Sequence, residues 1–518
     1  MTLILGGPLL WLSVILPVGA GLIAWLAGVE TEEASRLAGG ISAILLAIPG
    51  AIVAGLYAGG LVSEGVLDPF YATFHRVGTI ALAVDGLNGP IVLGVSAVTA
   101  AVAAYSVRYM RVRIEEMERE GERAPGMGLY FFLYNLFAAA MLGLAMATNL
   151  ILFYVFLELT LVPSFLLIAY WGYGDRRRIS LLYFVWTHIG AVLLLTGIIY
   201  YGVKLGTFDY LRVPQLSPVG PVEAALGTAA KAVALLMSIG LFIKMAVFGV
   251  HMWLPYAHAE APTPISALLS PNLIGLTGYA YARFVIPSFP SILLGWRNYL
   301  VALAFTTIIY GGLVALTQRD FKRFLAYSSI SQMGYMLLGL ATLTSIGIAG
   351  AMFHYLVHAI GKALLFMTAG VFITELHGLR DIRAMGGLAR RYPLTAALAL
   401  YGFLHLSGMP PSPGIWSEWM ILVGLYRVYN HPLSTLFSIA LVTAVALTVS
   451  AAYSFITMRR IFYGQPRSDL AKKGAEVRNV LVVSMFSLLL VGFLVFILAT
   501  PLINSLMRVA SLLVIHLV

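Results

Sequence analysis

Long apolar segments recur along the whole chain, each close to the roughly 20 residues that an α-helix needs to cross the hydrocarbon core of a bilayer. The apolar blocks between polar breaks predict fourteen such helices. Their centres fall near residues 17, 48, 95, 137, 160, 191, 242, 275, 306, 333, 362, 407, 445 and 489. We therefore expect an all-α fold, a polytopic membrane protein with about 14 transmembrane helices, because helices satisfy their own backbone hydrogen bonds in lipid.

The composition agrees with this fold class. Of the 518 residues, 60% are apolar and 10% are charged, whereas a soluble globular chain has roughly 45–50% and about 25%. This excludes a disordered chain, a secreted disulfide scaffold and a soluble nucleic-acid binder. The chain has no cysteine, P-loop, dinucleotide fingerprint or HExxH motif, so we expect neither a cofactor nor a metal in it. Asn and Gln together number only twelve, a depletion of heat-labile amides that is typical of thermophilic proteins.

The basic residues predict how the helices are oriented. Loops after odd-numbered spans carry 22 of the 32 Lys and Arg residues, and loops after even-numbered spans, with the C-terminal tail, carry six. Cytoplasmic loops are enriched in Lys and Arg, so the odd loops are expected in the cytoplasm and both termini outside a plasma membrane. The first span has no basic n-region or cleavage site and is interpreted as a true span. The net charge of +10 then mostly reflects the basic residues of the predicted cytoplasmic loops.

A few charges lie inside apolar segments, where each costs at least ~2.5–3.5 kcal/mol on insertion scales. Glu158 lies within FYVFLELTLVPSFLL of the fifth span, and Lys244 lies within LLMSIGLFIKMAVFGVHMWLP of the seventh. Both are too deep to reach the membrane surface, so we interpret them as functional candidates. Lys231 lies near the outer start of the seventh span and can extend its amine to the interface, so it is a secondary candidate.

The eleventh span carries three titratable groups on one face. His354, His358 and Lys362 recur at i, i+4 and i+8 in GAMFHYLVHAIGKALLFMTAG. A single buried histidine is usually a satisfied core residue, but a row of three predicts a file of groups that passes protons, because histidine gains and loses a proton near neutrality. Glu418, in PPSPGIWSEWMILVG of the twelfth span, completes the set.

Prolines predict that two spans are interrupted. The seventh meets Pro255 in HMWLPYAHAEAPTP, a stretch that also holds the secondary candidates His251 and His258, and the twelfth meets Pro410 and two further prolines. Paired interruptions are typical of inverted-repeat transporters with ion sites near the midplane. We therefore predict N-terminal spans in 1–107, two inverted five-helix repeats in 126–290 and 296–463, and a last span in 479–518.

Three motifs, KMAVFGVHMWLPYAHAEAPTPISALLS (244–270), QRDFKRFLAYSSISQMGYM (318–336) and HAIGKALLF (358–366), resemble the antiporter-like subunits of the complex I superfamily. That superfamily includes NADH:quinone oxidoreductase, its F420H2- and ferredoxin-linked relatives, membrane-bound hydrogenases and Mrp-type Na+/H+ antiporters. FLELTLVPSFLLIAYWG (156–172), GIWSEWMIL (414–422) and AAYSFITMRRIFYG (451–464) look most like the M-type subunit, chain 4.

The resemblance implies roles for individual residues. Glu158 resembles a glutamate that modulates the lysine matched by Lys244, His358 resembles a histidine of the central hydrophilic axis, and Glu418 resembles the terminal glutamate. The M-type lysine of the eighth span is missing, because Gly275 or Leu276 occupies its position. We therefore expect Lys362 to supply the central charge together with His354 and His358.

The resemblance also implies a function. The chain is expected to be a proton-translocating subunit of a complex I-like oxidoreductase and to do no redox chemistry itself. Flavin, iron–sulfur clusters or a NiFe centre, and quinone, would belong to partner subunits: neighbouring antiporter-like subunits and a peripheral redox arm. The alternatives are a subunit of an Mrp-type Na+/H+ antiporter, an antiporter-like subunit of a membrane-bound hydrogenase and a purely structural membrane subunit.

Overall fold

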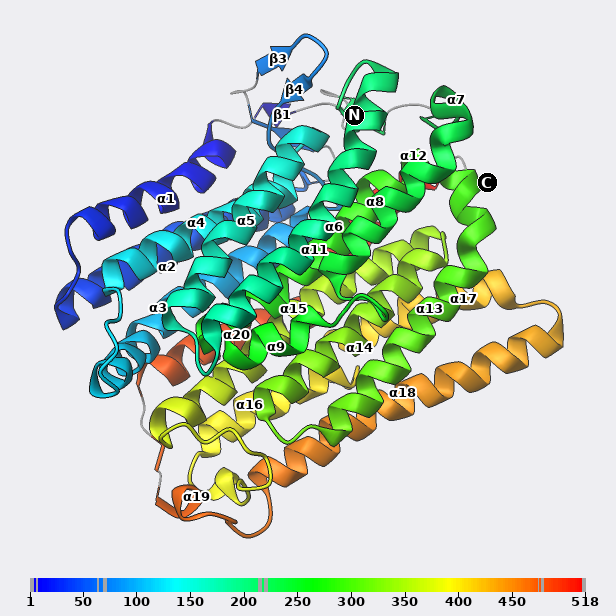
Figure 1. Ribbon diagram of the computed structural model, residues 1–518. Helices are drawn as coiled ribbons and strands as arrows, with labels where there is room; N and C mark the ends of the chain where they lie inside the picture. The colour runs from blue at the N-terminus through cyan, green and yellow to red at the C-terminus, as the bar shows by residue number, and fades with distance from the viewer. Residues whose placement is uncertain are drawn as a thin grey trace.

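Almost the whole chain is helical in the computed structural model, which describes residues 4–5, 8–62, 65–68, 72–212, 217–218, 222–473, 475–476 and 479–514. Long helices lie side by side across the molecule, with short strands at one end and α19 at the other (Figure 1). The predicted all-α membrane fold is confirmed.

Eleven helices of the described chain are long and apolar enough to cross a membrane. They are α1 (Leu9–Leu26), α2 (Glu32–Ala58), α3 (Gly89–Arg119), α4 (Met127–Met146), α5 (Leu150–Trp171), α6 (Arg176–Leu205), the run from α7 (Val222–Leu226) through η1 (Gly227–Ala229) to α8 (Ala230–Met245), α13 (Pro290–Thr317), α15 (Ser345–Glu375), α18 (Leu433–Phe462) and α20 (Val480–Ile497). The exact number of fourteen spans stays a prediction.

Burial separates a central helix from a peripheral set. The most apolar part of α15 is buried throughout within the protein, whereas α1, α2 and α18 leave most of theirs exposed. Exposed apolar side chains suit lipid, which is as apolar as they are. The helix that carries the row of His354, His358 and Lys362 is thus the one most shielded from lipid.

Two helices are interrupted, as the prolines predict. The first pair is α8 and α9 (Trp253–Glu260), and the second is α16 (Pro393–Leu406) and α17 (Gly414–Tyr429). Pro410 lies inside the second interruption, but Pro255 lies in the first turn of α9, after the non-helical stretch 246–252. Proline is tolerated in a first turn because the N–H that it lacks has no intrahelical partner there.

The remaining described helices lie outside this set of eleven. Between α9 and α13 the chain runs through alternating α and π segments, and π turns are common at functional sites. The segments are α10 (Thr263–Leu268), η2 (Leu269–Leu273), α11 (Ile274–Ala280), η3 (Tyr281–Val285) and α12 (Ile286–Ser288); elsewhere lie α14 (Phe321–Ala341), η4 (Leu388–Arg390), α19 (Asp469–Lys473) and α21 (Ala499–Leu513).

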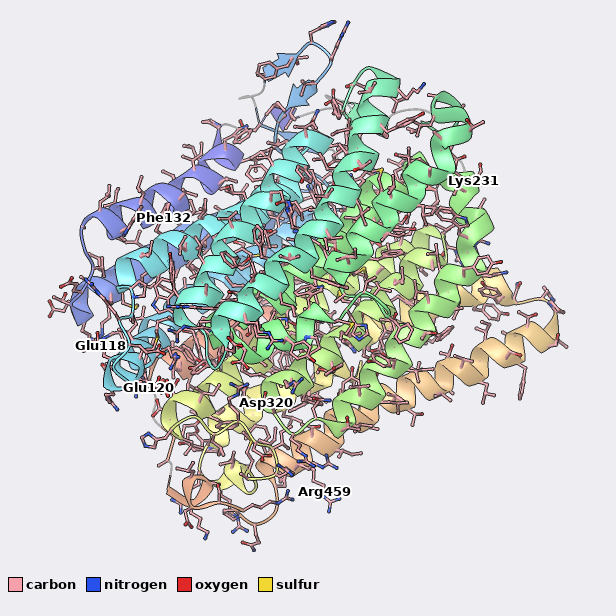
Figure 2. The ribbon with its side chains drawn as sticks, in the orientation of Figure 1. Glu118, Glu120, Phe132, Lys231, Asp320 and Arg459 are labelled. Atoms are coloured by element: carbon pink, nitrogen blue, oxygen red, sulfur yellow. The ribbon has the colours of Figure 1, made fainter. Side chains whose placement is uncertain are left out.

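The two ends of the helix bundle differ in charge. Basic loops meet at one end, the basic end, through the ion pairs Arg108–Glu375 at 2.9 Å, Arg176–Glu122 at 2.6 Å and Arg380–Asp320 at 2.7 Å. Glu118, Glu120, Asp320 and Arg459 lie at this end and Lys231 lies at the other (Figure 2). In a loop of the basic end, the Arg383 guanidinium lowers the pKa of the Asp381 carboxyl. The alternation of basic loops along the sequence predicts that these loops gather at one end of the bundle, as they do. The side of the membrane that this end faces stays a prediction.

Short strands occupy the connections at the opposite end (Figure 1). One sheet has the order β1-β2-β5 and two further pairs are antiparallel. The strands are β1 (Ile4–Leu5), β2 (Val66–Leu67), β3 (Ala72–Phe74), β4 (Gly78–Ile80), β5 (Ala83–Val84), β6 (Leu211–Arg212) and β7 (Ser217–Pro218).

Small residues let α6 and α8 pack closely. A Cβ on Gly190 of α6 would lie 3.0 Å from the Gly240 carbonyl oxygen, and a Cβ on Gly240 of α8 would lie 2.5 Å from the Gly190 carbonyl oxygen. Helices in lipid are not driven together by the hydrophobic effect, so the close van der Waals packing that small residues allow stabilises the contact instead. This contact holds α8, which carries Lys244, beside α6, the helix that follows α5.

A buried ion pair joins the start of α3 to η3. Arg283 Nη2 lies 2.5 Å from Asp85 Oδ1, and both side chains are at most 3% exposed. The same carboxylate oxygen accepts the backbone N–H groups of Leu87 and Asn88, and the Tyr279 hydroxyl lies 3.1 Å from Arg283 Nε. These hydrogen bonds compensate the desolvation of both charges.

We expect Asp85→Asn to destabilise the protein by about 3–5 kcal/mol, because it leaves a buried guanidinium without its counter-charge. The measurement is thermal unfolding of the detergent-solubilised chain, followed by tryptophan fluorescence. The control is Asp469→Asn, since Asp469 is 83% exposed in its pair with Lys472. An unfolding temperature of Asp85→Asn equal to that of the wild type would contradict the prediction.

Candidate functional site

One end of the candidate site lies on α5, α6 and α8. Glu158 Oε2 of α5 lies 3.2 Å from His188 Nδ1 of α6, and its other carboxylate oxygen is buried with no hydrogen-bond partner among the described residues. Lys244 of α8 lies within electrostatic range of Glu158, although no ion pair of 4.0 Å or less joins these two described side chains. His188 is a partner that the sequence did not single out, although it stands between the apolar runs 181–186 and 189–195 of α6.

The end of α8 suits a buried cation. Lys244 is 3% exposed and stands in the last turn of the helix, where the partial negative charge of the backbone carbonyls stabilises cations by about 0.3–1 kcal/mol. The helix stops at Ala246, which adopts the left-handed conformation with φ of +57°. The interruption therefore ends the helix directly after the lysine.

The row on α15 is fully enclosed by protein. His354 Nδ1 lies 3.1 Å from Ser417 Oγ, and because the Ser417 hydroxyl itself donates to the Gly414 carbonyl, the His354 N–H is the donor. Both ring nitrogens of His358 are buried, and neither has a hydrogen-bond partner within the described chain. Unpaired buried nitrogens are costly in a fold and are typical of sites that bind water or protons.

Lys362 binds the neighbouring helix α14. Its ammonium donates to the Leu325 carbonyl at 3.0 Å and to the Ser328 hydroxyl, and its side chain is fully buried. No carboxylate forms an ion pair with it in the described part of the chain. A lysine held only by neutral groups in a low-dielectric interior can be driven between its charged and neutral forms by nearby charges.

Glu418 lies at the second interruption. It is 8% exposed, and its Oε1 is buried with no partner in the part of the chain that the structure describes. The carboxylate packs on Gly408, where a Cβ would lie 2.2 Å from Glu418 Oε2 and where φ is +62°. Glycine at this position both permits the left-handed turn and leaves room for the carboxylate.

Polar side chains between His354 and Glu418 escaped the sequence analysis. Gln332 Nε2 of α14 donates to the Leu406 carbonyl at 3.1 Å and to the Tyr453 hydroxyl at 2.8 Å. Tyr335 is hydrogen-bonded to Ser450 at 3.0 Å. A single neutral polar residue within a span does not show which other residues it will contact, so only the helix packing shows that these side chains gather here.

His405 of α16 is another residue that the sequence analysis missed. It is 1% exposed, its Nδ1–H donates to the Tyr401 carbonyl at 2.9 Å, and its Nε2 has no partner among described atoms. A Cβ on Gly361 of α15 would lie 2.5 Å from the His405 Cβ, so this histidine stands beside the row. The available signal was its place five residues before Pro410 of the second interruption.

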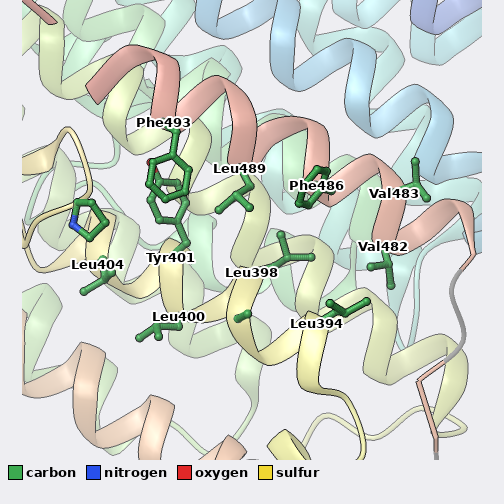
Figure 3. A pocket seen from close by; sticks show the side chains of 12 residues that line it. Leu394, Leu398, Leu400, Tyr401, Leu404, Val482, Val483, Phe486, Leu489 and Phe493 are labelled. Atoms are coloured by element: carbon green, nitrogen blue, oxygen red, sulfur yellow. The ribbon is translucent and has the colours of Figure 1, made fainter. Parts of the chain in front are cut away.

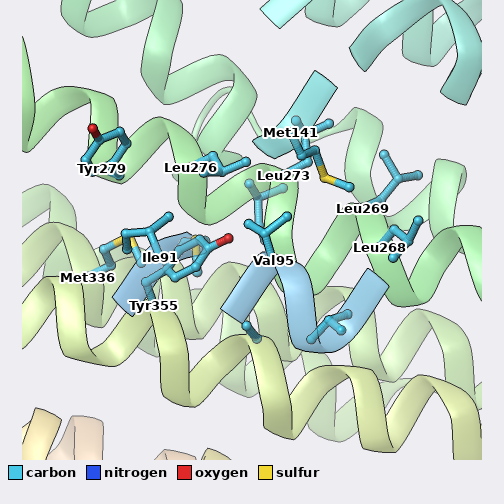
Figure 4. Packing of buried hydrophobic residues seen from close by; sticks show 14 of the residues in the cluster. Ile91, Val95, Met141, Leu268, Leu269, Leu273, Leu276, Tyr279, Met336 and Tyr355 are labelled. Carbon is cyan, nitrogen blue, oxygen red and sulfur yellow. The ribbon is translucent and has the colours of Figure 1, made fainter. Parts of the chain in front are cut away.

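The structure shows what fills the space at Gly275. A Cβ there would lie 2.5 Å from the ring of Tyr355 and 3.5 Å from the side chain of Met336. Tyr355, Met336 and Leu276 are part of the same apolar packing (Figure 4). A lysine side chain at position 275 would collide with the Tyr355 ring.

The secondary candidates are dispersed. Lys231 is exposed near the end opposite the basic end, and His251 Nε2 lies 3.3 Å from the Tyr310 hydroxyl in the first interruption. His258 of α9 is fully buried, with its ring 5.1 Å from that of Phe366 and without a hydrogen-bond partner for either ring nitrogen in the described residues. Of these, His258 lies nearest to the row on α15.

By sequence, Lys322 is one of the 22 basic residues between predicted spans that are expected in the cytoplasm, because it lies between the ninth and tenth spans. The structure places it in the first turn of α14, fully buried, with its ammonium donating to the Ala261 carbonyl. One sequence signal could have shown that Lys322 is buried, unlike Arg319 and Arg323. This signal was its helical spacing from the apolar side chains of α14.

No group of three or more His, Asp or Glu side chains in the described ranges could hold a metal ion. A hollow of 640 Å³ lies between α16 and α20 (Figure 3). Its lining is apolar apart from the Tyr401 hydroxyl, and it includes Leu398, Phe486 and Phe493. It offers no ionisable group for ion transfer.

The chain is similar to known membrane subunits. The family model described as "NADH:quinone oxidoreductase/Mrp antiporter, TM" matches residues 147–448. NADH-quinone oxidoreductase subunit M of Rickettsia prowazekii is 32% identical over 70% of this chain and 71% of that protein. Hydrogenase-4 component B of Escherichia coli is 32% identical over 94% and 73%. A chain of respiratory complex I from Thermus thermophilus superimposes with a TM-score of 0.78 and 25% identity, covering 97% of this chain and 99% of that one.

We expect Lys362→Met to lower proton translocation by about 100-fold or more, the range for loss of a positioned proton-transfer group. The measurement is acidification of sealed inverted vesicles that contain the assembled complex, followed with a pH-sensitive dye. Lys231→Met is the matched control, since Lys231 is exposed at the opposite end. Unchanged acidification by Lys362→Met would rule out the central role of this lysine.

Proposed function

Because the chain belongs to the NADH:quinone oxidoreductase/Mrp antiporter transmembrane family, we propose that it is a proton-translocating subunit, M-like, of a complex I-like oxidoreductase. Electron transfer in partner subunits would drive protons through this chain. The chain itself would contribute ion translocation and no redox chemistry.

The observation that carries the proposal is the row of buried ionisable groups within the protein interior. His354, His358 and Lys362 lie on the most enclosed helix, and the Ser417 contact leads from this row to Glu418. Ionisable groups at membrane depth are expensive and mark ion pathways in most proteins that hold them. A purely structural subunit would have no need of unpaired nitrogens at His358.

Electrostatics supplies the proposed mechanism. A carboxylate near Lys244 stabilises its ammonium form, and withdrawal of that carboxylate makes loss of the proton easier. Glu158 can alternate between Lys244 and His188, which already lies 3.2 Å from it. A charge change arriving from a neighbouring subunit would shift this balance and move a proton toward Lys362 and Glu418. Interactions of this kind are several times stronger in a protein interior than in water.

The proposed setting is a multisubunit complex in a plasma membrane. Partners would be neighbouring antiporter-like subunits and a peripheral redox arm, which would hold the flavin, the iron–sulfur clusters or NiFe centre, and the quinone. The two interrupted helices support a pair of inverted repeats at 126–290 and 296–463, with both termini outside. The proposed composition of the complex is tested by identifying the subunits that copurify with the chain.

The second candidate function is a subunit of a Na+/H+ antiporter, which the family description also includes. Sealed vesicles separate the two. Proton movement that requires electron transfer and proceeds without Na+ supports the main proposal. Proton exchange driven by a Na+ gradient, with no electron donor present, supports the antiporter.

We expect Glu158→Gln to lower pumping, or the electron transfer coupled to it, by about 5–150-fold, the usual range for coupling between two sites. The amide keeps the size of the side chain but removes the charge that acts on Lys244. Both rates are measured in the same vesicles, with Glu33→Gln, an exposed change at the start of α2, as control. Wild-type values of both rates would count against this role for Glu158.

A further inference from the structure

Lys322 is the feature of the interior that the proposed axis does not use. It is fully buried, and it stands in the first turn of α14, where the partial positive charge of a helix start disfavours a cation. The Ala261 carbonyl at the end of α9 accepts its hydrogen bond. A buried lysine at a helix start is costly, so its presence calls for a physical reason.

The surroundings of Lys322 contain charges of both signs. Asp320 and Glu260 are the acidic groups within electrostatic range, and Arg113 and Arg380 are the basic ones. The Tyr173 ring lies 5.8 Å from Lys322 Nζ, 4.1 Å from the Arg113 guanidinium and 5.9 Å from that of Arg380. The negative face of an aromatic ring attracts cations, so Tyr173 helps to hold three of them together.

This cluster opens to the surface of the basic end. A hollow of 120 Å³ reaches Tyr173 and is lined also by Arg113, Glu116 and His377. The Glu260 carboxylate packs on Gly174, which lines a second hollow of 460 Å³. At the basic end, the predicted cytoplasmic side, one opening therefore reaches Tyr173 beside Lys322, and a second reaches Gly174, on which Glu260 packs.

Along α14, Lys322 lies one helical turn from the residue that binds Lys362 of the row on α15. Lys362 is bound to the carbonyl of Leu325, which is three residues after Lys322 on α14. On the other side, Ala261, which holds Lys322, is three residues after His258. Residues three apart on a helix are neighbours on one face. His258 lies within electrostatic range of both lysines, and its ring packs on Phe366, one turn beyond Lys362.

We propose that Lys322 and His258 form the entry by which protons pass from the basic end to Lys362 and His358. In this step an N–H bond of the Lys322 ammonium breaks and an N–H bond forms on a free ring nitrogen of His258. The neutral amine then takes a proton from water at the basic end, and His258 passes its own proton to the row. The inference rests on the proposed function, since it names the uptake side of the same pathway.

The test replaces Lys322 by arginine and His258 by phenylalanine in the assembled complex. Arginine keeps a charge and hydrogen-bond donors for the Ala261 carbonyl but does not release its proton in proteins. Phenylalanine at 258 removes the ring nitrogens, which make no hydrogen bond among the described residues. Lys204→Arg makes the same chemical change at an exposed lysine in the last turn of α6, at the opposite end, and is the matched control. Protons moved per electron are measured in sealed inverted vesicles.

We expect Lys322→Arg and His258→Phe each to lower this ratio by about 10²-fold, with Lys204→Arg close to wild type. Wild-type pumping by Lys322→Arg and His258→Phe, together with its loss in Lys362→Met, overturns the entry and leaves the proposed function standing. If Lys362→Met and Glu158→Gln also pump normally, the proposed function itself fails. Should Lys322→Arg prevent assembly, His258→Phe decides alone: loss of pumping supports the entry, and normal pumping overturns it.

Discussion

The free-energy cost of placing charge in hydrocarbon organises this protein. Each ionisable group at membrane depth has to be surrounded by protein or water, and the structure meets this requirement by enclosing α15 on all sides. His354, His358 and Lys362 all lie on that helix, while the outer helices expose apolar side chains. The position of the polar row and the order of helices around it are two results of the same constraint.

The interrupted helices solve a related problem. A continuous helix satisfies its own backbone and leaves nothing for an ion, whereas a break within the bundle frees carbonyl groups and makes room for a side chain. Lys244 stands at the end of α8, and Glu418 packs on Gly408 in the gap between α16 and α17. The chain thus places one basic and one acidic group at its two breaks, with the row of α15 between them in the proposed pathway.

The interior around Gly275 leaves no room for a longer side chain, because the Tyr355 ring occupies that space. Lys362 is held by α15 against α14, where it binds the Leu325 carbonyl. In the proposed function Lys362 is the central cation, in place of a lysine at position 275 or 276.

The sequence alone determined the fold class, the two interruptions and the deep charges, because the bilayer imposes a length and a polarity that can be read residue by residue. It also identified Glu158, Lys244, Lys362 and Glu418 as candidates, since a charge within an apolar run stands out. Tertiary structure alone decided that Lys322 is buried while its neighbour Arg323 is not, and that His405 and Gln332 join the interior. The reason is physical: burial at the ends of helices, and contacts of neutral or single polar residues, depend on which helices pack together. Hydropathy along one segment carries no information about its neighbours.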